Sequence, residues 1–197
     1  MLYRAFLRGC LLAALIAVAA CGGGGGDDAP KSVSDVNNVV AAIDGRSVET
    51  LGELVGSRQE ACTSQPGDAG GPPACRFGEA EGTLVVVAPS AQCEAPYLRS
   101  GDVPNALEHL LDPEPEVYAA FPIPATASAV EPVGEYVVVL SSNEEGAPPG
   151  RRLVIEGGKV VLLDFGCGES PEQMVEGIDD ADFLIPPPDR RTPAEGS

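Results

Sequence analysis

The stretch RRLVIEGGKVVLLDF, residues 151–165, decides the fold class. Two mostly apolar runs, rich in β-branched residues, flank the pair Gly157-Gly158. Because glycine readily adopts the positive φ angles of a two-residue turn, this stretch predicts a β-hairpin. The run VVLL inside it, like VVVL at 137–140, is apolar on both faces of a strand, whereas a sheet with one wet face alternates. We therefore expect the second sheet face to be covered by the tail, a loop or a second subunit, and we favour a weak homodimer.

The rest of the chain predicts further helices and strands. Apolar residues at three- and four-residue intervals indicate an amphipathic helix over 33–43 and another after Ser47 as its N-cap. A third helix should begin at Asp102 as N-cap, and a short last helix should begin with a capping box at Ser170. β-Branched runs bounded by Gly or Pro predict strands, most clearly at 82–88, with others near 92–98, 117–123 and 135–141. The expected fold class is α+β, with N-terminal helices packed on a curved antiparallel sheet of about four to six strands, braced by disulfides.

This order of elements resembles the cone-shaped fold of nuclear transport factor two, ketosteroid isomerase and their relatives. The resemblance concerns topology and rests on no motif. It implies a pocket between the helices and a curved sheet, and relatives that commonly dimerise through that sheet. The run ACTSQPGDAGGPPACRFGEAEGT at 61–83 is also similar to segments of uncharacterised exported bacterial proteins.

The first twenty residues are typical of a secretory signal peptide. Arg4 and Arg8 make the N-terminal segment basic, and the apolar run LLAALIAVAA follows at 11–20. A helix that spans a membrane needs about 20 apolar residues, so this run is too short for one. The sequence predicts that residues 1–20 are a cleaved leader.

The end of this leader, Val18-Ala19-Ala20-Cys21, resembles the lipobox of bacterial lipoproteins. That resemblance implies that Cys21 is acylated and becomes the first residue of the mature chain. Gly22 stands where an aspartate would favour retention at the inner membrane, so the resemblance implies the outer membrane. The membrane partner would then be reached through lipid, not through a spanning helix.

The mature chain divides into a tether, a domain and a tail. Residues 21–31 contain five consecutive glycines and nothing to bury, so they predict a flexible tether. They lack the Gly-Lys-Ser/Thr of a phosphate-binding loop. Residues 32–185 are long enough for a single domain with its own core. Residues 186–197 are rich in proline and charge and predict a disordered tail.

Charge disfavours one class of partner. The chain has 12 basic residues against 30 acidic ones, which gives a formal net charge of −18. Phosphate backbones repel such a polyanion, so nucleic-acid binding is disfavoured. A basic partner, divalent cations and simple solubility remain as explanations of the charge.

Four cysteines remain once the leader is removed and Cys21 carries lipid. Cys62, Cys75, Cys93 and Cys167 in an exported chain indicate two disulfides, for which three connectivities are open. We favour Cys62–Cys75, across a turn-rich loop, and Cys93–Cys167. A zinc site is disfavoured because the sequence has no CxxC pair and a single histidine.

The sequence assigns no catalytic residue, metal or cofactor. Four residues, Tyr97, His109, Tyr136 and Asp164, are candidates for lining a pocket, because phenol, imidazole and carboxylate groups can bind or move protons. His109 in an amphipathic helix is otherwise a surface or boundary residue. The acidic run at 179–182 suggests calcium but lacks the spacing of an EF-hand, so a solvated turn is preferred.

These patterns favour an outer-membrane lipoprotein whose domain is a binding or interaction module, either in the periplasm or at the surface. Its partner would be another protein of the envelope. The alternative is a small-ligand carrier or an enzyme that uses a pocket inside the cone.

Overall fold

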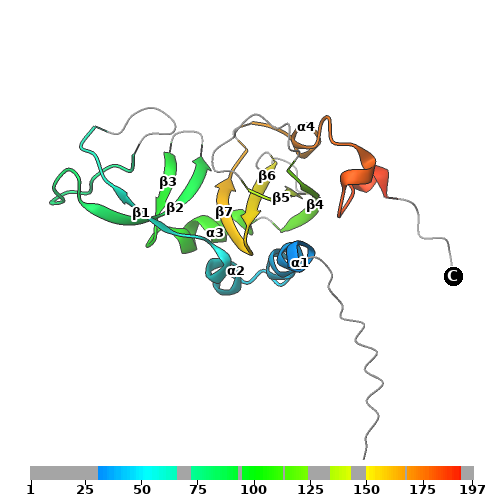
Figure 1. Ribbon diagram of the computed structural model, residues 1–197, viewed down its shortest axis with the longest axis horizontal. Coiled ribbons are helices and arrows are strands. Elements are labelled where there is room, and N and C mark those ends of the chain that lie inside the picture. The colour runs from blue at the N-terminus through cyan, green and yellow to red at the C-terminus, as the bar shows by residue number, and fades with distance from the viewer. Residues whose placement is uncertain are drawn as a thin grey trace, which may run out of the picture.

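Helices cover both faces of a mixed sheet. The computed structural model describes residues 31–65, 72–92, 95–112, 114–123, 134–142, 150–166 and 168–191. The helices are α1 (Lys31–Asp44), α2 (Val48–Leu54), α3 (Val103–Leu110) and the short α4 (Pro171–Met174), followed by the 3-10 turns η1 (Asp180–Asp182) and η2 (Pro188–Arg190). Figure 1 shows α1 and α2 below the strands and α4 on the opposite side.

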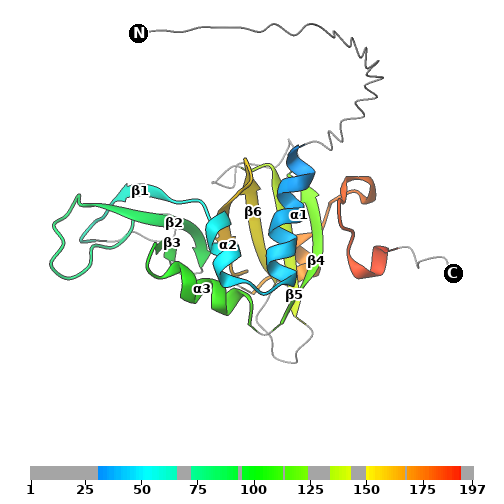
Figure 2. The ribbon, with the colours of Figure 1, turned by 90° about the horizontal axis from the view of Figure 1, so that it is seen from below.

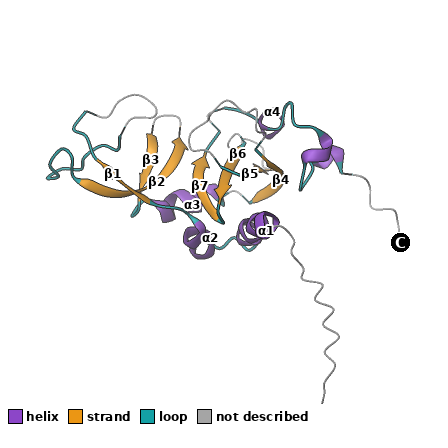
Figure 3. Ribbon diagram, in the orientation of Figure 1, coloured by secondary structure: helices purple, strands orange, loops and turns teal. Residues whose placement is uncertain are grey.

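Seven strands are described, and they form one sheet. The strands are β1 (Arg58–Ala61), β2 (Leu84–Gln92), β3 (Ala95–Arg99), β4 (Pro115–Pro122), β5 (Tyr136–Ser142), β6 (Arg151–Glu156) and β7 (Lys159–Asp164). Their order across the sheet is β1-β2-β7-β6-β5-β4, and β3 also pairs with β2. The mixed α+β class is confirmed, and Figure 3 shows the strands together, with helices on either side of them.

Two details of the expected sheet were wrong. The sheet has more strands than the four to six expected, partly because β1 has the sequence RQEA, which carries no strand signal. It is also not wholly antiparallel, since β2 and β7 run parallel with Ser90 opposite Leu163 and Ala91 opposite Asp164. The chain leaves β2 through β3, α3 and three further strands before it returns as β7, and a crossover of this length permits parallel pairing.

The hairpin of β6 and β7 is confirmed. Glu156 pairs with Lys159, and the two turn residues between them have positive φ angles, 54° at Gly157 and 76° at Gly158. Positive φ at both central residues is the geometry of the two-residue turn that suits the right-handed twist of strands.

The three predicted helix starts are confirmed, and two of them have the expected side-chain capping bond. Ser47 accepts a hydrogen bond from the Thr50 backbone N–H at its Oγ (3.1 Å), and Ser170 forms a full capping box with Gln173. Asp102 precedes α3 as expected, but its side chain makes no capping bond. Its carboxylate instead pairs with Arg76 at 2.7 Å, and its backbone has helical angles (φ −98°, ψ −12°).

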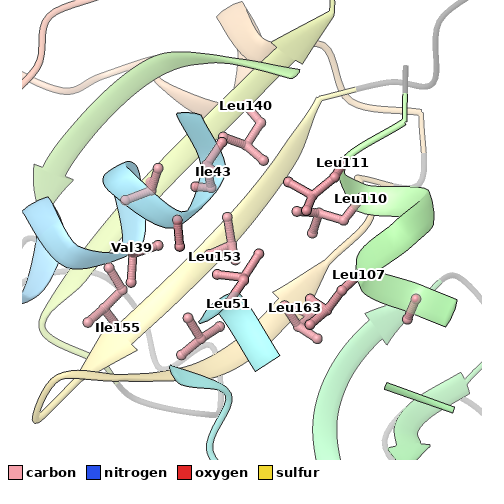
Figure 4. Packing of buried hydrophobic residues seen from close by; sticks show 14 of the residues in the cluster. Val39, Ile43, Leu51, Leu107, Leu110, Leu111, Leu140, Leu153, Ile155 and Leu163 are labelled. Carbon is pink, nitrogen blue, oxygen red and sulfur yellow. The ribbon is translucent and has the colours of Figure 1, made fainter. Parts of the chain in front are cut away.

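The main core lies between the sheet and the helices α1, α2 and α3. Figure 4 shows Val39 and Ile43 of α1, Leu51 of α2 and the leucines of α3 converging on β5, β6 and β7. The strand residues are Leu140, Leu153, Ile155 and Leu163, and these side chains are fully buried. Figure 2 shows α1 lying across the strands that supply this surface.

The second face of the sheet is covered by the chain's own C-terminal part. A separate cluster holds Phe121, Val139 and Leu162 from the strands with Met174 and Val175 from the α4 region. Phe183 packs edge-on against Phe121, with ring centroids 5.7 Å apart. The apolar strands therefore find their second partner in this segment.

The structure describes residues 186–191 of the expected tail. Pro187 is buried, and Arg191 donates hydrogen bonds to the backbone carbonyls of Val117 (3.0 Å) and Tyr118 (3.4 Å) in β4. These two bonds connect residue 191 to strand β4. Residues 192–197 of the expected tail lie outside the described residues.

A lobe formed by β1, β2, β3 and their loops, residues 58–102, projects from this body (Figure 2). Its own small core contains Val85, Val87 and Cys62, with Cys75 and Tyr97 packed against it. The predicted Cys62–Cys75 disulfide is present. Cys93 and Cys167 lie outside the described residues, as does Cys21, so the second disulfide and the lipidation stay predictions.

Candidate functional site

A groove between α2 and α3 is the best candidate for a binding site on the described part of the chain. Its volume is about 590 Å³, and it is lined by Val48, Glu49, Gly52, Glu53, Ser100, Val103, Pro104 and Leu107. We call it the α2–α3 groove. Both helices are amphipathic and bury one face against the sheet, with Leu51 and Leu107 fully buried, so the groove lies where their outer flanks meet.

Gly52 of α2 forms part of the groove wall and faces Leu107 of α3. A Cβ atom placed on it would lie 3.6 Å from Leu107 Cδ1, which is an ordinary van der Waals contact. The residue is helical, so no unusual φ angle requires glycine here. A glycine inside a helix is destabilising by about 0.5–1 kcal/mol relative to alanine. What its lack of a side chain provides is space in the groove.

The groove is apolar with an acidic rim. Glu49 and Glu53 are one helical turn apart on α2, both are exposed, and neither carboxylate has an ion pair among the described residues. Lys159 lies near the end of this helix, but its Nζ donates to the Glu53 backbone carbonyl (2.8 Å) and not to a carboxylate. No arginine or lysine lines the groove. The surface therefore offers apolar contact beside unneutralised negative charge.

The four residues predicted to line a pocket do not come together, and none of them lines this groove. Tyr97 lies in the lobe, where its hydroxyl accepts a hydrogen bond from Arg58 Nη2 (2.6 Å) and the guanidinium stacks 5.3 Å from the ring centre. His109 is exposed on α3, and its backbone carbonyl accepts a hydrogen bond from Arg151 Nη1 at 3.2 Å.

The other two lie on opposite faces of the sheet. Tyr136 packs, partly buried, against the main core under the helices. Asp164 is 4 % exposed at the end of β7, where its carboxylate pairs with Arg152 and accepts the Gly166 backbone N–H (2.9 Å). Because both oxygens already have partners, Asp164 acts as a local anchor for the strand end, and the arrangement gives no catalytic constellation.

Arg151 is a buried charge that the sequence analysis did not identify. Its side chain is 1 % exposed at the start of β6, and Nη1 donates to the carbonyls of Leu110 (2.6 Å), His109 (3.2 Å) and Asp112 (3.5 Å). It thus caps the C-terminal end of α3, where the helix dipole favours a cation. Its Nε and Nη2 atoms have no hydrogen-bond partner among the described residues. Burial lowers the pKa of this guanidinium, because desolvation disfavours its charged form.

The only sequence signal for Arg151 is a pair of arginines at the start of an apolar strand. Alternation along β6 sends Arg152 to one face and Arg151 to the face shared with Leu153 and Ile155. That face is the core, so the strand register determines which arginine is buried.

The described residues contain no group of three or more His, Cys, Asp or Glu side chains arranged to hold an ion. Within the 179–182 run, Asp180 pairs with Arg190 at 2.8 Å. None of the helices in the described ranges is long and apolar enough to cross a membrane. In comparisons with known proteins, no family model, curated protein or solved structure matches this chain.

Proposed function

We propose that this chain is an outer-membrane lipoprotein whose domain is a binding module, and that the α2–α3 groove binds an apolar segment flanked by basic residues. The observation that carries the binding role is the pairing of an apolar groove with the unpaired carboxylates of Glu49 and Glu53. Apolar burial would supply most of the affinity, and the carboxylates would select a cationic partner and speed its association.

The anchoring part of the proposal rests on the leader. The lipobox-like Val18-Ala19-Ala20-Cys21 and the glycine-rich residues that follow support a lipid anchor and a tether. A flexible tether of about ten residues has a root-mean-square reach of roughly 17 Å, enough to hold a domain clear of headgroups. Replacing Cys21 by Ser should move the protein from the membrane fraction to the soluble fraction. An unchanged distribution would rule out the anchor.

The cone-like fold remains part of the proposal. The order of two helices, three strands, a third helix and a four-stranded meander supports the resemblance, as does the packing of α1, α2 and α3 on one sheet face. The alternative function, catalysis or ligand carriage in a cone pocket, has less support. Side chains of Leu, Ile and Val fill the space between those helices and the sheet, and the four candidate polar residues lie apart.

A defined peptide tests the groove. The probe is a fluorescent, helix-forming peptide of leucine and lysine, and its partner is the same peptide with glutamate in place of lysine. We expect saturable binding of the basic peptide, measured by fluorescence anisotropy, and much weaker binding of the acidic one. Because the rim carboxylates are exposed, the affinity should fall as salt is added.

Two variants at Gly52 make the test specific. Gly52→Leu puts a side chain into the groove and should weaken binding by at least about tenfold, a loss of about 1.4 kcal/mol. Gly52→Ala adds only a methyl group in contact with Leu107 and should bind nearly as well as the natural chain. Equal affinity of the leucine variant would show that the peptide binds elsewhere, and the groove would lose its role.

A further inference from the structure

One aromatic side chain stands fully in solvent on the lobe. Phe77 is 108 % exposed, and two more of the large apolar residues exposed on the described chain, Leu84 (64 %) and Val86 (41 %), lie on β2 of the same lobe. The fourth, Leu184 (40 %), is the only one outside it among the described residues. Single exposed apolar residues are common on surfaces, so the exposure of Phe77 needs a second observation before it has a meaning.

The second observation is that Phe77 is held on a fixed turn. The Glu79 backbone N–H donates to the Arg76 carbonyl (3.0 Å), and Gly78 has a φ of 88°, as the third residue of a type II turn requires. The Glu79 carboxylate closes the turn from the side, since its Oε2 accepts the Arg76 backbone N–H (2.7 Å). Phe77 occupies the second position of this turn, where its side chain points away from these bonds into solvent.

Arg99 locks the same carboxylate to the body of the lobe. Its Nη1 and Nη2 donate to Glu79 Oε1 (3.1 Å) and Oε2 (2.7 Å), which makes a bidentate ion pair. Nη2 also donates to the Ala74 carbonyl (2.6 Å). These bonds lower the pKa of the Glu79 carboxyl, the largest cause being the hydrogen bond from Arg99. The side chain of Arg99 is only 13 % exposed and that of Glu79 is 27 % exposed, so this ion pair is partly shielded from solvent. Bidentate arginine–carboxylate pairs fix the relative orientation of the two side chains as well as the distance between them.

The start of the turn is also fixed to other elements. Cys75, immediately before Arg76, is tied by its disulfide to Cys62 beside β1. The Arg76 side chain reaches Asp102 at the start of α3 (2.7 Å). These bonds surround a turn whose apex is Phe77, but they do not bury its ring. What they fix is the position of the ring in space.

We propose that Phe77 is a preorganised anchor that inserts into an apolar pocket of a partner protein. Aromatic anchors in pockets provide much of the affinity of protein interfaces, and a rigid mount reduces the entropy lost on binding. The charges next to the ring are already paired, Arg76 with Asp102 and Glu79 with Arg99, so docking leaves no new charge stranded.

A protein pocket fits these observations better than a bilayer. A fluid membrane accepts a phenyl ring in any orientation, so it gains nothing from a rigid turn. The half-exposed pair of Arg76 and Asp102 beside the ring would have to lose water in the membrane interface without new hydrogen bonds, whereas a protein rim can supply them.

Photo-crosslinking in the cells that produce the protein tests the proposal on the full chain. Phe77→p-benzoylphenylalanine places the reactive group at the tip, and Leu184→p-benzoylphenylalanine is the matched control at an exposed apolar site outside the lobe. We expect one protein adduct at position 77 that the control lacks. An adduct to lipid, an adduct to a second copy of this chain, or no adduct would each overturn the proposal.

The crosslinked protein, once identified, is then purified and titrated against the uncrosslinked full chain. Phe77→Ser should weaken binding at least about tenfold without changing the unfolding temperature, because a fully exposed ring makes no stabilising contact. Arg99→Met keeps the ring but frees the turn, and should weaken binding by a smaller factor. Equal affinity of Phe77→Ser and the natural chain would show that the ring takes no part.

Discussion

The substitution Gly52→Ala should stabilise the protein, although it adds an atom between two packed helices. Gly52 lies in α2, where alanine is favoured over glycine by about 0.5–1 kcal/mol. The new methyl group would sit 3.6 Å from Leu107 Cδ1, a favourable contact with no overlap. For a domain of this size, a gain of about 1 kcal/mol raises the unfolding temperature by about 2–4 °C.

Thermal unfolding and urea unfolding, followed by circular dichroism, measure this change. An unchanged urea m-value would show that the gain is in stability and not in the exposed surface. The matched control is Gly157→Ala, the same chemical change at a turn residue with φ of 54°. There alanine meets no atom within 4 Å but is forced into the left-handed region, and should destabilise by about 1–2 kcal/mol.

The opposite signs of these two changes make the reasoning refutable. If Gly52→Ala lowered the unfolding temperature, the new methyl group would have to lie closer to Leu107 Cδ1 than 3.6 Å. The groove between α2 and α3 would then be narrower than described. If both variants were destabilised equally, the cost of losing glycine would not depend on backbone conformation. Either result would remove the argument that Gly52 leaves space for a ligand.

Three further predictions concern the charges and the disulfide. Arg151→Met should destabilise the protein by about 1–3 kcal/mol in urea unfolding, since the buried Leu110 carbonyl loses its donor. A gain in stability would instead mean that burying the unpaired charge of Arg151 costs more than its hydrogen bonds contribute. The double variant Cys62→Ser with Cys75→Ser should lose about 3 kcal/mol by the chain-entropy relation for a loop of this length, measured by calorimetry; an unchanged unfolding temperature would show that the loop is already ordered in the unfolded chain. Glu79 has a lowered pKa when folded, so its contribution is present above its ordinary pKa of about 4.3 and is lost as pH falls through the folded value. Glu79→Gln should therefore flatten the acid side of the stability profile, and a profile that keeps the natural slope would contradict this.

Local chemistry made much of the fold predictable. Gly157-Gly158 required a turn with positive φ, and Ser170 with Gln173 carried both halves of a capping box. These features depend on residues a few positions apart, so they can be identified in the sequence. The disulfide Cys62–Cys75 belongs with them, because it closes a short, turn-rich loop.

Long-range pairing could not be predicted in the same way. The parallel contact of β2 with β7 joins residues more than seventy positions apart, and no local pattern distinguishes it from an edge. The failure of Asp102 as a side-chain cap has the same origin, because Arg76, its ion-pair partner, is supplied by the lobe. The scattered positions of Tyr97, His109, Tyr136 and Asp164 show that residue type alone does not define a pocket.

The covered second face changes what the apolar strands imply about partners. Their two-sided pattern predicted a cover formed by the tail, a loop or a second subunit, and Phe121, Val139 and Leu162 already pack against the α4 region and Phe183. A dimer through this face would first have to displace that segment and expose its own apolar side chains, at about 25 cal/mol for each Å² returned to water. Any association is therefore better served by surfaces that are apolar and uncovered. On the described chain these are the α2–α3 groove and the lobe that carries Phe77, and neither lies on the face that the strand pattern had indicated.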